Sequence, residues 1–463
     1  MTKKTSTVSR RTFLSNVAVV GASSTLGAGS LFTACSSDGR NNENKLTPLH
    51  PAGEVYIPEL PDKAIDGKPV RAAIIGCGAR GTGAGFNFLS AGDNLSVVAC
   101  ADIFKDKLDG CRKRLKEEKN NAVADDKCFL GFDAYKKACE LPEVDMVIIA
   151  SPSVFHPEQF KYAIEQGKHV FCEKPAAVDA AGYRTYMMGV KLAQSKNLCV
   201  VTGTYRHYNR GYVESYKKIQ EGYIGRILSA SVYYNIGHIS LVRPRPEWTN
   251  VEYMIRDMFN WKWLTGDHVV DQLVHCIDFF SWFSHMKPLN VIALGSRLRR
   301  VTGDIYDNFG MDFEYPGGVH LYGMARQIDN CDNRVSDIIQ GTKGTWSNVN
   351  EDGFTIRDHD GNVVWQYDKE TAQKQFKQHD PYTLEHVDLI NHIRSGKVIN
   401  FSETLAISTM ACIMARESAY SGRTITWDAM TQADMNFLPA DLTLSNVDMS
   451  KYTIPVPGTS PEI

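Results

Sequence analysis

Two parts of the sequence hold side chains whose types and spacing suit proton transfer. Lys174 follows a short apolar run and precedes Pro175, while Asp271 and His275 stand four residues apart in a helix-like stretch. A lysine can move a proton or hold a carbonyl oxygen, and an imidazole beside a carboxylate can act as an acid or a base. The alternatives are a solvated loop lysine and a structural His–Asp pair on a solvated helix face.

The stretch around His275 contains a polar stripe on an otherwise apolar helix, predicted for residues 267–283. On such a helix Asp267, Asp271, His275 and Asp278 would share one face. The stripe must face a polar cavity, because burying carboxylates without partners is costly. We expect Asp271 to orient the His275 ring and to raise its pKa. His268 lies off the stripe and is interpreted as structural.

One stretch has the order of a dinucleotide-binding motif. An apolar run is followed by Gly76, Gly78 and Gly81, then by a helix-length segment and a second apolar run that ends in Asp102. Such glycines allow a tight turn, the approach of a pyrophosphate and close helix–strand packing, and the helix start offers free N–H groups to phosphates. Asp102 would bind ribose hydroxyls and repel a 2′-phosphate, which favours NAD over NADP despite the nearby Lys105. The alternative is an ordinary glycine-rich turn.

Two further predicted strands end in residues that would face such a cofactor. One runs into Ser151 and Pro152, with His156 after them, and the next runs into Glu173 and Lys174. Ligands of open α/β sheets bind at the carboxyl ends of the strands, so we expect both ends near the dinucleotide. An equally good interpretation of His156 is the start of the following helix.

A long irregular stretch, residues 237–266, is rich in tryptophan and arginine. Trp261 and Trp263, together with Arg243 and Arg245, suit stacking on a sugar ring and binding of its hydroxyl or acid groups. The alternative is a contact between domains or subunits.

The order of predicted elements indicates two domains. Apolar strands alternate with helices up to residue 203, which is typical of a doubly wound parallel α/β sheet, a Rossmann domain. The alternating strands and few helices beyond it indicate an α+β domain with a large open mixed or antiparallel sheet. Because open sheet faces are often buried between subunits, we expect a homo-oligomer, a dimer or tetramer. We divide the chain into a signal and tether (1–45), an extended arm (46–69), the Rossmann domain (70–203), the α+β domain (204–430) and a C-terminal tail (431–463).

The first forty residues have the form of an export signal. Arg10 and Arg11 belong to a twin-arginine pattern, an apolar segment follows, and Cys35 stands where a lipoprotein would be acylated. Small residues before Cys35 and a polar tether after it favour lipidation over a plain thiol past a signal-peptidase cut. Twin-arginine export carries folded proteins, so we expect a periplasmic protein that holds its cofactor tightly and regenerates it in place. Its membrane contact would be the lipid anchor alone.

The composition sets broad limits on partners. The chain has 463 residues and a formal net charge of −2, which gives no global attraction to nucleic acid or to an anionic membrane. Beyond the signal, no stretch is long and apolar enough to span a bilayer. The other ten of the 11 cysteines are scattered without a C-x-x-C pair or metal-like pairing with histidine. We therefore expect neither a disulfide framework nor a metal site.

Taken together, residues 70–427 resemble the Gfo/Idh/MocA family of NAD(P)-dependent sugar and cyclitol oxidoreductases. The marks are the glycine motif, Ser151-Pro152, Glu173-Lys174-Pro175, the Asp271–His275 helix and residues 341–345. The sequence departs from the family pattern at Thr265-Gly266 and Gln272-Leu273. The resemblance implies that Lys174, Asp271 and His275 are catalytic, with His275 as general base on the substrate hydroxyl. It implies cofactor contacts at Gly76, Gly78, Ala79, Arg80, Gly81, Asp102, Ser151, Pro152, His156, Glu173, Lys174 and Arg206, and we add substrate contacts at Tyr205, His207, Trp261, Trp263 and Asp267.

The resemblance also implies the activity. We expect an NAD-dependent oxidoreductase that acts on a hydroxyl of a sugar, glycoside or cyclitol. The second interpretation is an NAD-dependent glycoside hydrolase that oxidises a hydroxyl, eliminates the aglycone, adds water and returns the hydride. That cycle is redox-neutral and suits an exported protein. The third is a sugar-binding lipoprotein without turnover.

Overall fold

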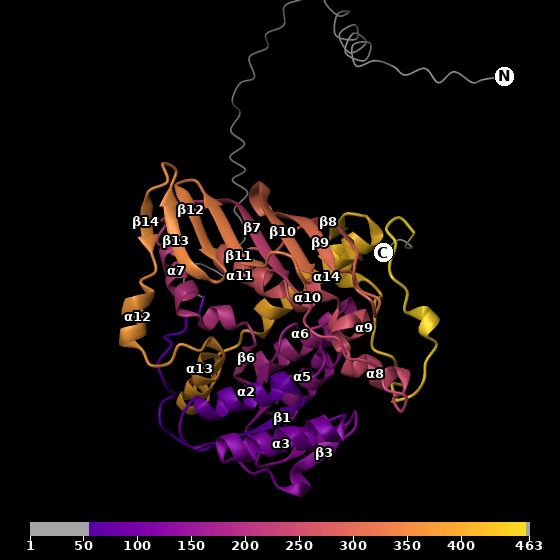
Figure 1. Cartoon of the computed structure of the whole chain (residues 1–463). Coiled ribbons are helices and arrows are strands. Elements are labelled where there is room, and N and C mark those ends of the chain that lie inside the picture. Colours follow the sequence, from indigo (N-terminus) through magenta and orange to yellow (C-terminus); the bar gives the residue numbers. More distant parts are fainter. Residues whose placement is uncertain (1–54, 460–463) are drawn as a thin grey trace, which may run out of the picture. The chain divides into compact units, whose positions relative to one another are not determined.

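The computed structural model describes residues 55–459 (Figure 1). The predicted twin-arginine pattern, Cys35 and the first part of the arm lie outside these residues. Among the described residues, no helix combines the length and the apolar character that crossing a bilayer requires.

The N-terminal domain is a six-stranded parallel sheet covered by helices. Its strand order, β3-β2-β1-β4-β5-β6, is that of a doubly wound dinucleotide-binding fold. The central strand β4 is buried along its whole length, which confirms the expectation that its apolar run is covered on both faces. The strands are β1 (Val70–Ile75), β2 (Leu95–Asp102), β3 (Cys128–Leu130), β4 (Met146–Ile149), β5 (His169–Cys172) and β6 (Val200–Thr202), and the helices are α2 (Ala79–Ser90), α3 (Lys105–Lys119), α4 (Ala134–Glu140), α5 (His156–Glu165) and α6 (Ala180–Ser195).

The second sheet has nine strands in the order β14-β13-β12-β11-β7-β10-β9-β8-β15. It is mixed, because β7 and β10 run parallel while their other neighbours run antiparallel. Burial alternates along β9 and β10, so one face packs on helices and the other is open. The strands are β7 (Ile227–Ile236), β8 (Asn290–Ser296), β9 (Asn308–Tyr315), β10 (Val319–Gln327), β11 (Arg334–Gly341), β12 (Gly344–Val349), β13 (Asp352–Asp358), β14 (Val363–Gln366) and β15 (Ile425–Thr426).

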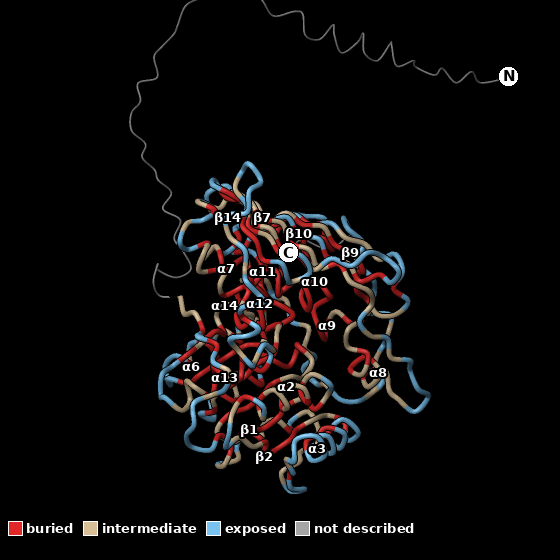
Figure 2. The backbone as a smooth tube through the Cα atoms, turned by 60° about the vertical axis from the view of Figure 1, so that its left-hand side comes forward, coloured by how far each residue is buried: buried red, intermediate tan, exposed pale blue. Residues whose placement is uncertain are grey.

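Of the helices of this part of the chain, α10 and α11 are buried, as the red tube of Figure 2 shows, whereas α8 and α12 lie at opposite sides in Figure 1. Helix α14 is buried along nearly its whole length, against β8 on one side and α6 on the other. These helices are α7 (Arg210–Gln220), α8 (Asn250–Arg256), α9 (Lys262–Thr265), α10 (His268–Asp271), α11 (Val274–Ser284), α12 (Lys369–Gln375), α13 (Pro381–Ser395), α14 (Ser402–Ser421) and α15 (Trp427–Gln432).

The chain returns from the second sheet to the first, so the two domains interlock. Helix α13 packs on α2 of the Rossmann domain. The arm that precedes β1 also runs along α13. There the Tyr56 hydroxyl donates a 2.7 Å hydrogen bond to Asp388, and the Ile65 amide donates one of 2.7 Å to Asn391. Its described part, residues 55–69, forms neither a helix nor a strand.

The single helix predicted for residues 267–283 is wrong, because the structure has two shorter helices there. Asp267 adopts φ 77° and its carboxylate accepts hydrogen bonds from the amides of His268 and Tyr306, which fixes it as the cap of α10. The backbone then tightens at Gln272 and Leu273, where the His275 amide bonds the Gln272 carbonyl three residues back. The break changes which face each later side chain occupies, so the predicted polar stripe does not exist.

Candidate active site

The glycine turn has the predicted conformation. Gly76 ends β1 with φ +89°, and a Cβ there would lie 2.5 Å from the Ser151 amide nitrogen. A Cβ on Gly81 would lie 1.8 Å from the Gly76 carbonyl oxygen, so only glycine lets α2 approach the strand this closely. The side of Gly78 where a Cβ would project is open space.

A cavity of about 390 Å³ opens at this turn. Its walls come from the glycine turn, from the ends of β2 and β4, and from a segment of the second domain. The predicted cofactor contacts that line it are Gly76, Gly78, Ala79, Arg80, Asp102, Ser151 and Pro152. An elongated ligand with phosphates at the α2 N-terminus fits this set, so the residues present suit a dinucleotide.

Asp102 lies where the adenosine ribose acid of a dinucleotide fold is expected. Its two carboxylate oxygens accept hydrogen bonds from the Cys77 amide (2.6 Å) and the Phe104 amide (2.8 Å). Burial raises the pKa of Asp102, and the two amides oppose that rise. Each oxygen keeps a further lone pair for a ribose hydroxyl. Lys105 turns away and pairs with Asp109, whereas Lys107 lines the cavity.

Glu173 and Arg80 form an ion pair beside the cavity. The Arg80 guanidinium donates to Glu173, lies 4.7 Å from the centre of the Tyr382 ring, and stands 3.8 Å from Glu385. Glu385 is fully buried, and neither of its oxygens has a hydrogen-bond partner among the described residues. Burial raises the pKa of Glu385 well above its ordinary value, and the charge of Arg80 opposes that rise.

Lys174 and Asp271 are brought together across the two domains. Lys174 Nζ donates to the Asp271 carbonyl oxygen at 2.5 Å and lies 3.3 Å from its carboxylate. The second carboxylate oxygen accepts from the Gln272 side chain. Asp271 therefore holds the lysine, not the histidine.

His275 starts the second helix of the broken pair and is nearly buried. Its Nδ1 has no hydrogen-bond partner within the described part of the chain, and the Tyr205 ring stands edge-on with ring centres 4.7 Å apart. Burial, with the charges of Lys174, Arg206 and Arg80, lowers the pKa of His275 well below its ordinary value. The prediction that Asp271 raises this pKa is wrong, because that carboxylate faces Lys174 and Gln272. His275 is thus a neutral imidazole, ready to accept a proton.

Several predicted ligand contacts are structural instead. Arg206 is buried against Asp337 (3.0 Å) and Glu351 (2.8 Å) in the second domain, so its cofactor role is wrong. His207 stacks on Trp282 and its Nε2 lies 2.7 Å from Asp278, which excludes a substrate contact. Asp267 caps α10 and also accepts from the Tyr420 hydroxyl, so it is likewise not a substrate contact. Burial raises the pKa of Asp267 to about 6.

The two tryptophans predicted to stack on a sugar are buried as well. Trp261 and Trp263 belong to a small apolar cluster with Phe104, Phe155 and α8, and Trp261 meets Tyr452 edge-on. The alternative interpretation, a contact between domains, is the correct one. Tyr205 remains at the site through its contact with His275, although its hydroxyl donates to Glu351.

His156 begins α5, as one of the two interpretations predicted. Its Nδ1 lies 2.7 Å from the Pro175 carbonyl oxygen and its Nε2 lies 2.8 Å from the Ser151 carbonyl oxygen. The ring therefore ties together the loops after β4 and β5, and both its nitrogens are used. It positions the cofactor loops and does not line the cavity, which corrects the cofactor-contact interpretation.

Other residues of the site carried no recognised sequence signal. Gln159 accepts a 2.6 Å hydrogen bond from Ser151 Oγ and lines the cavity, and a glutamine inside a helix is an unremarkable residue. The wall from the second domain includes Val242, Ile255 and Arg256, which lie more than a hundred residues from the glycine turn. Sequence patterns within one domain cannot show that such residues return to the pocket.

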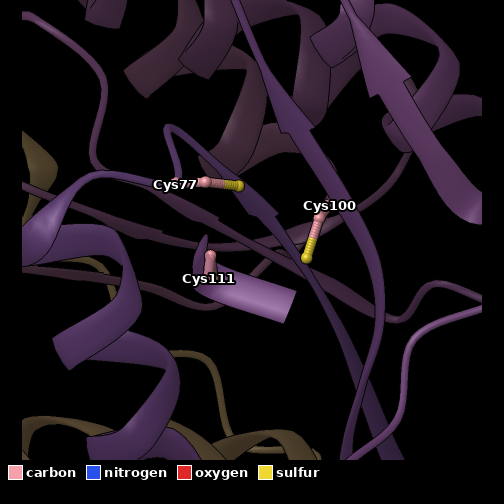
Figure 3. A group of neighbouring side chains, drawn as sticks. All are labelled: Cys77, Cys100 and Cys111. Carbon is pink, nitrogen blue, oxygen red and sulfur yellow. The ribbon is translucent and has the colours of Figure 1, made fainter. Parts of the chain in front are cut away.

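Three cysteines that are far apart in the sequence lie together behind the glycine turn. Cys77, on the turn, Cys100, on β2, and Cys111, on α3, have sulfur atoms within 4.8 Å of one another (Figure 3). The spacing rules that predicted no metal-like grouping missed this cluster, because a turn, a strand and a helix each supply one member. All three side chains belong to the apolar core of the domain, and packing as small apolar groups accounts for them.

Comparisons with known proteins place the chain in a wider context. Residues 70–204 match the model of the Gfo/Idh/MocA oxidoreductase family with an NAD-binding Rossmann fold, and residues 212–347 match that of the Gfo/Idh/MocA C-terminal domain. A glycosyl hydrolase family 109 protein of Bacteroides fragilis is 34% identical over 132 residues, 28% of this chain and 27% of the relative. The chain thus spans about a quarter of that relative's length.

Two further relatives match more of the chain. An inositol 2-dehydrogenase of Pseudomonas savastanoi is 27% identical over 237 residues, 48% of this chain and 70% of the relative. The crystal structure of a scyllo-inositol dehydrogenase from Lactobacillus casei, with bound NAD(H) and scyllo-inositol, aligns with a TM-score of 0.59 and 19% identity. The alignment covers 78% of this chain and 99% of that one. This likeness establishes that the fold is shared.

Proposed function

Because the chain belongs to the Gfo/Idh/MocA family of oxidoreductases, we propose that it oxidises a hydroxyl of a sugar, glycoside or cyclitol with NAD. The observation that carries the proposal is that Lys174, which follows β5, contacts Asp271 of the second domain and that its charge acts on His275 of the same domain. The glycine turn and Asp102 suit a dinucleotide with a free ribose 2′-hydroxyl.

The residues at this site have separate roles in the proposed proton transfer. A nicotinamide dinucleotide held by the glycine turn supplies a hydride acceptor. The neutral imidazole of His275 accepts the proton of the substrate hydroxyl. The Lys174 ammonium, fixed by Asp271, holds the same oxygen as it becomes a carbonyl. Buried surroundings at His275 strengthen these interactions and exclude competing water.

A second candidate is the redox-neutral hydrolysis of a glycoside. The relatives in glycosyl hydrolase family 109 favour it. The matched segment of one of them is 34% identical to this chain, compared with 27% for the inositol 2-dehydrogenase. The same pair, His275 and Lys174, would serve both the oxidation and its reversal. The two activities share a first step and differ in whether an aglycone leaves.

We also propose that the mature protein is periplasmic and carries its cofactor tightly bound. The support is the twin-arginine pattern at Arg10-Arg11 and the lipoprotein-like position of Cys35. A protein outside the cytosol meets no pool of free NAD, so a dissociating cofactor would be lost. A retained cofactor must be regenerated where it is bound, so redox-neutral reactions or coupled half-reactions would suit this protein.

We propose further that the open face of the second sheet joins copies of the chain. Ile292 and Leu294 on β8 are in register, across β9, with Tyr322 and Met324 on β10. All four side chains are at least half exposed, and we call them the apolar row, although Asp312 and Gly310 of β9 lie between the two pairs. Such a row on a sheet is typical of a subunit interface.

The test begins with the purified protein and the cofactor that it carries. We expect denaturation to release NAD, identified by mass spectrometry, and a free sugar or cyclitol to produce the absorbance of the reduced nicotinamide. Release of nitrophenol from p-nitrophenyl glycosides without net reduction would instead support the hydrolase. If sugars bind and neither signal appears, with equal binding by the K174A/H275A double variant, the protein is a non-catalytic sugar-binding lipoprotein.

A further inference from the structure

The wall of the cofactor cavity that faces the Rossmann domain is a segment of the second domain, residues 237–261, here named the clasp. It supplies Ser240, Val242, Ile255, Arg256, Met258 and Phe259 to the cavity. These residues stand opposite Asp102, Phe104 and Lys107, at the ribose end of the Rossmann sheet. The adenosine half of a dinucleotide would therefore be enclosed between two domains.

Arg256, at the end of α8, fastens the clasp to the Rossmann domain. Its two terminal nitrogens donate to the two carboxylate oxygens of Asp106 at 2.9 and 3.0 Å, and its guanidinium lies 3.9 Å from the centre of the Phe104 ring. A third donor, Nε, bonds Glu252 at 2.9 Å. The paired geometry and the aromatic contact make this stronger than an ordinary surface ion pair. The attachment lies only two to four residues beyond Asp102.

The clasp is also held from outside by residues near the end of the described chain. Val251 donates its amide to the Ser445 carbonyl at 3.3 Å, and the Asn250 side chain donates to the Val447 carbonyl at 2.9 Å. Tyr452 meets Trp261 edge-on. Figure 1 shows this last, yellow part of the chain passing beside α8.

We propose that the clasp forms the second half of the adenosine site and sets how long the dinucleotide stays bound. Its ligand is an adenosine nucleotide with a free 2′-hydroxyl, because the Asp102 carboxylate next to the fastening disfavours a 2′-phosphate. Release requires the Arg256–Asp106 pair and the Arg256–Phe104 contact to break together. The inference rests on the proposed use of NAD and adds the residues that retain it.

The test measures retention of NAD in the full-length protein. Wild type and variants are loaded with NAD and dialysed, and the remaining dinucleotide is quantified by mass spectrometry after denaturation. We expect R256Q and D106N each to lose the dinucleotide at least tenfold faster than wild type. The charge-exchanged D106R/R256D variant should recover only part of the retention, because it restores the ion pair but not the contact with Phe104. The matched control is R114Q on α3, because Arg114 likewise donates two hydrogen bonds to one carboxylate, that of Glu118, and lies over an aromatic ring, that of Phe86, but does not line the cavity.

Limited proteolysis gives a readout that is independent of turnover. Bound NAD should protect residues 237–249 in wild type and R114Q, and less so in R256Q. D106N guards against misfolding, because the Asp106 side chain is mostly exposed. Retention in R256Q and D106N equal to wild type would overturn the proposal. Faster loss of NAD from these variants would support the role of the clasp. If wild type also failed to respond to any sugar, the proposed oxidation would be refuted while the role of the clasp would stand.

Discussion

Lys174 and His275 differ from their neighbours because few hydrogen bonds to the rest of the protein account for their burial. Lys174 is fixed only by Asp271, and Nδ1 of His275 lacks a partner in the described part of the chain. By contrast, Arg206 and His207 are each matched by carboxylates in the core. Polar atoms without partners in a buried site are where a substrate can bind.

We expect Lys174→Met and His275→Asn each to lower the rate of substrate oxidation by roughly 10²–10⁴. Neither side chain lines the cofactor cavity, so the content of bound dinucleotide should stay at the wild-type level. Stopped-flow absorbance of the bound nicotinamide measures the rate. The control is His320→Asn, since His320 lies half-exposed on the open sheet. Wild-type rates in either site variant would remove that residue from the catalytic assignment.

The lowered pKa of His275 predicts the pH dependence of the reaction. A base must be unprotonated, and a pKa below the ordinary 6.5 keeps the imidazole neutral through neutral and mildly acidic pH. We expect the acidic fall in kcat/KM to lie below pH 6.5, with full activity retained from pH 7 down to that value. A profile that already falls above pH 6.5 would show that Asp271, as the sequence suggested, raises the pKa after all.

At the scale of elements, the contact between β1 and α2 depends on one missing side chain. A Cβ on Gly81 would overlap the Gly76 carbonyl oxygen, whereas one on Gly83 of the same helix would meet only Arg80 at 3.9 Å. We expect Gly81→Ala to destabilise the fold by at least about 2 kcal/mol and to abolish dinucleotide binding. Gly83→Ala should stabilise it by about 0.5–1 kcal/mol, because alanine favours helix. Thermal unfolding and NAD titration of both variants compare them directly, and equal losses in the two would contradict the packing argument.

Local patterns were sufficient to predict most elements. The parallel strands are continuous apolar runs, and β7, β9 and β10 alternate strictly enough to be recognised. Strands β12 to β15 are harder to predict from such patterns, because they are short or rich in polar residues and depend on their pairing with neighbouring strands. The break between α10 and α11 was missed. The start of α10 is set by the Asp267 carboxylate, which accepts hydrogen bonds from the Tyr306 amide and the Tyr420 hydroxyl, residues that are distant in sequence.

The same distinction, between local patterns and contacts with distant residues, applies to the candidate site. The glycine turn, Asp102 and Lys174 could be predicted because each stands at the end of a strand whose direction is fixed by the fold. The roles of Asp271 and Arg206 could not, since each depends on a charge far away in the sequence, Lys174 for Asp271, and Asp337 and Glu351 for Arg206. Residues such as Arg256 enter the pocket only through the three-dimensional return of the chain.

At the scale of the whole molecule, the apolar row on the open sheet predicts the state of assembly. We expect the L294D/M324D double variant to have a smaller mass in solution than wild type, because carboxylates at these positions would be desolvated in an interface. Val349→Asp is the control, as Val349 is exposed on β12 outside the row. Sedimentation velocity measures the mass. A monomeric wild type, or a variant with unchanged mass, would rule out this face as the interface.

The residues that brace the clasp from outside, around Ser445 to Tyr452, follow in the sequence everything that they cover. A ribosome therefore completes the pocket, its wall and the fastening at Arg256 before it produces the outer brace. Until that moment the wall is supported on one side only. If the dinucleotide is retained as proposed, occupancy of the pocket would be set during synthesis, by the nucleotide supply around the nascent chain and not by the supply that the mature protein meets.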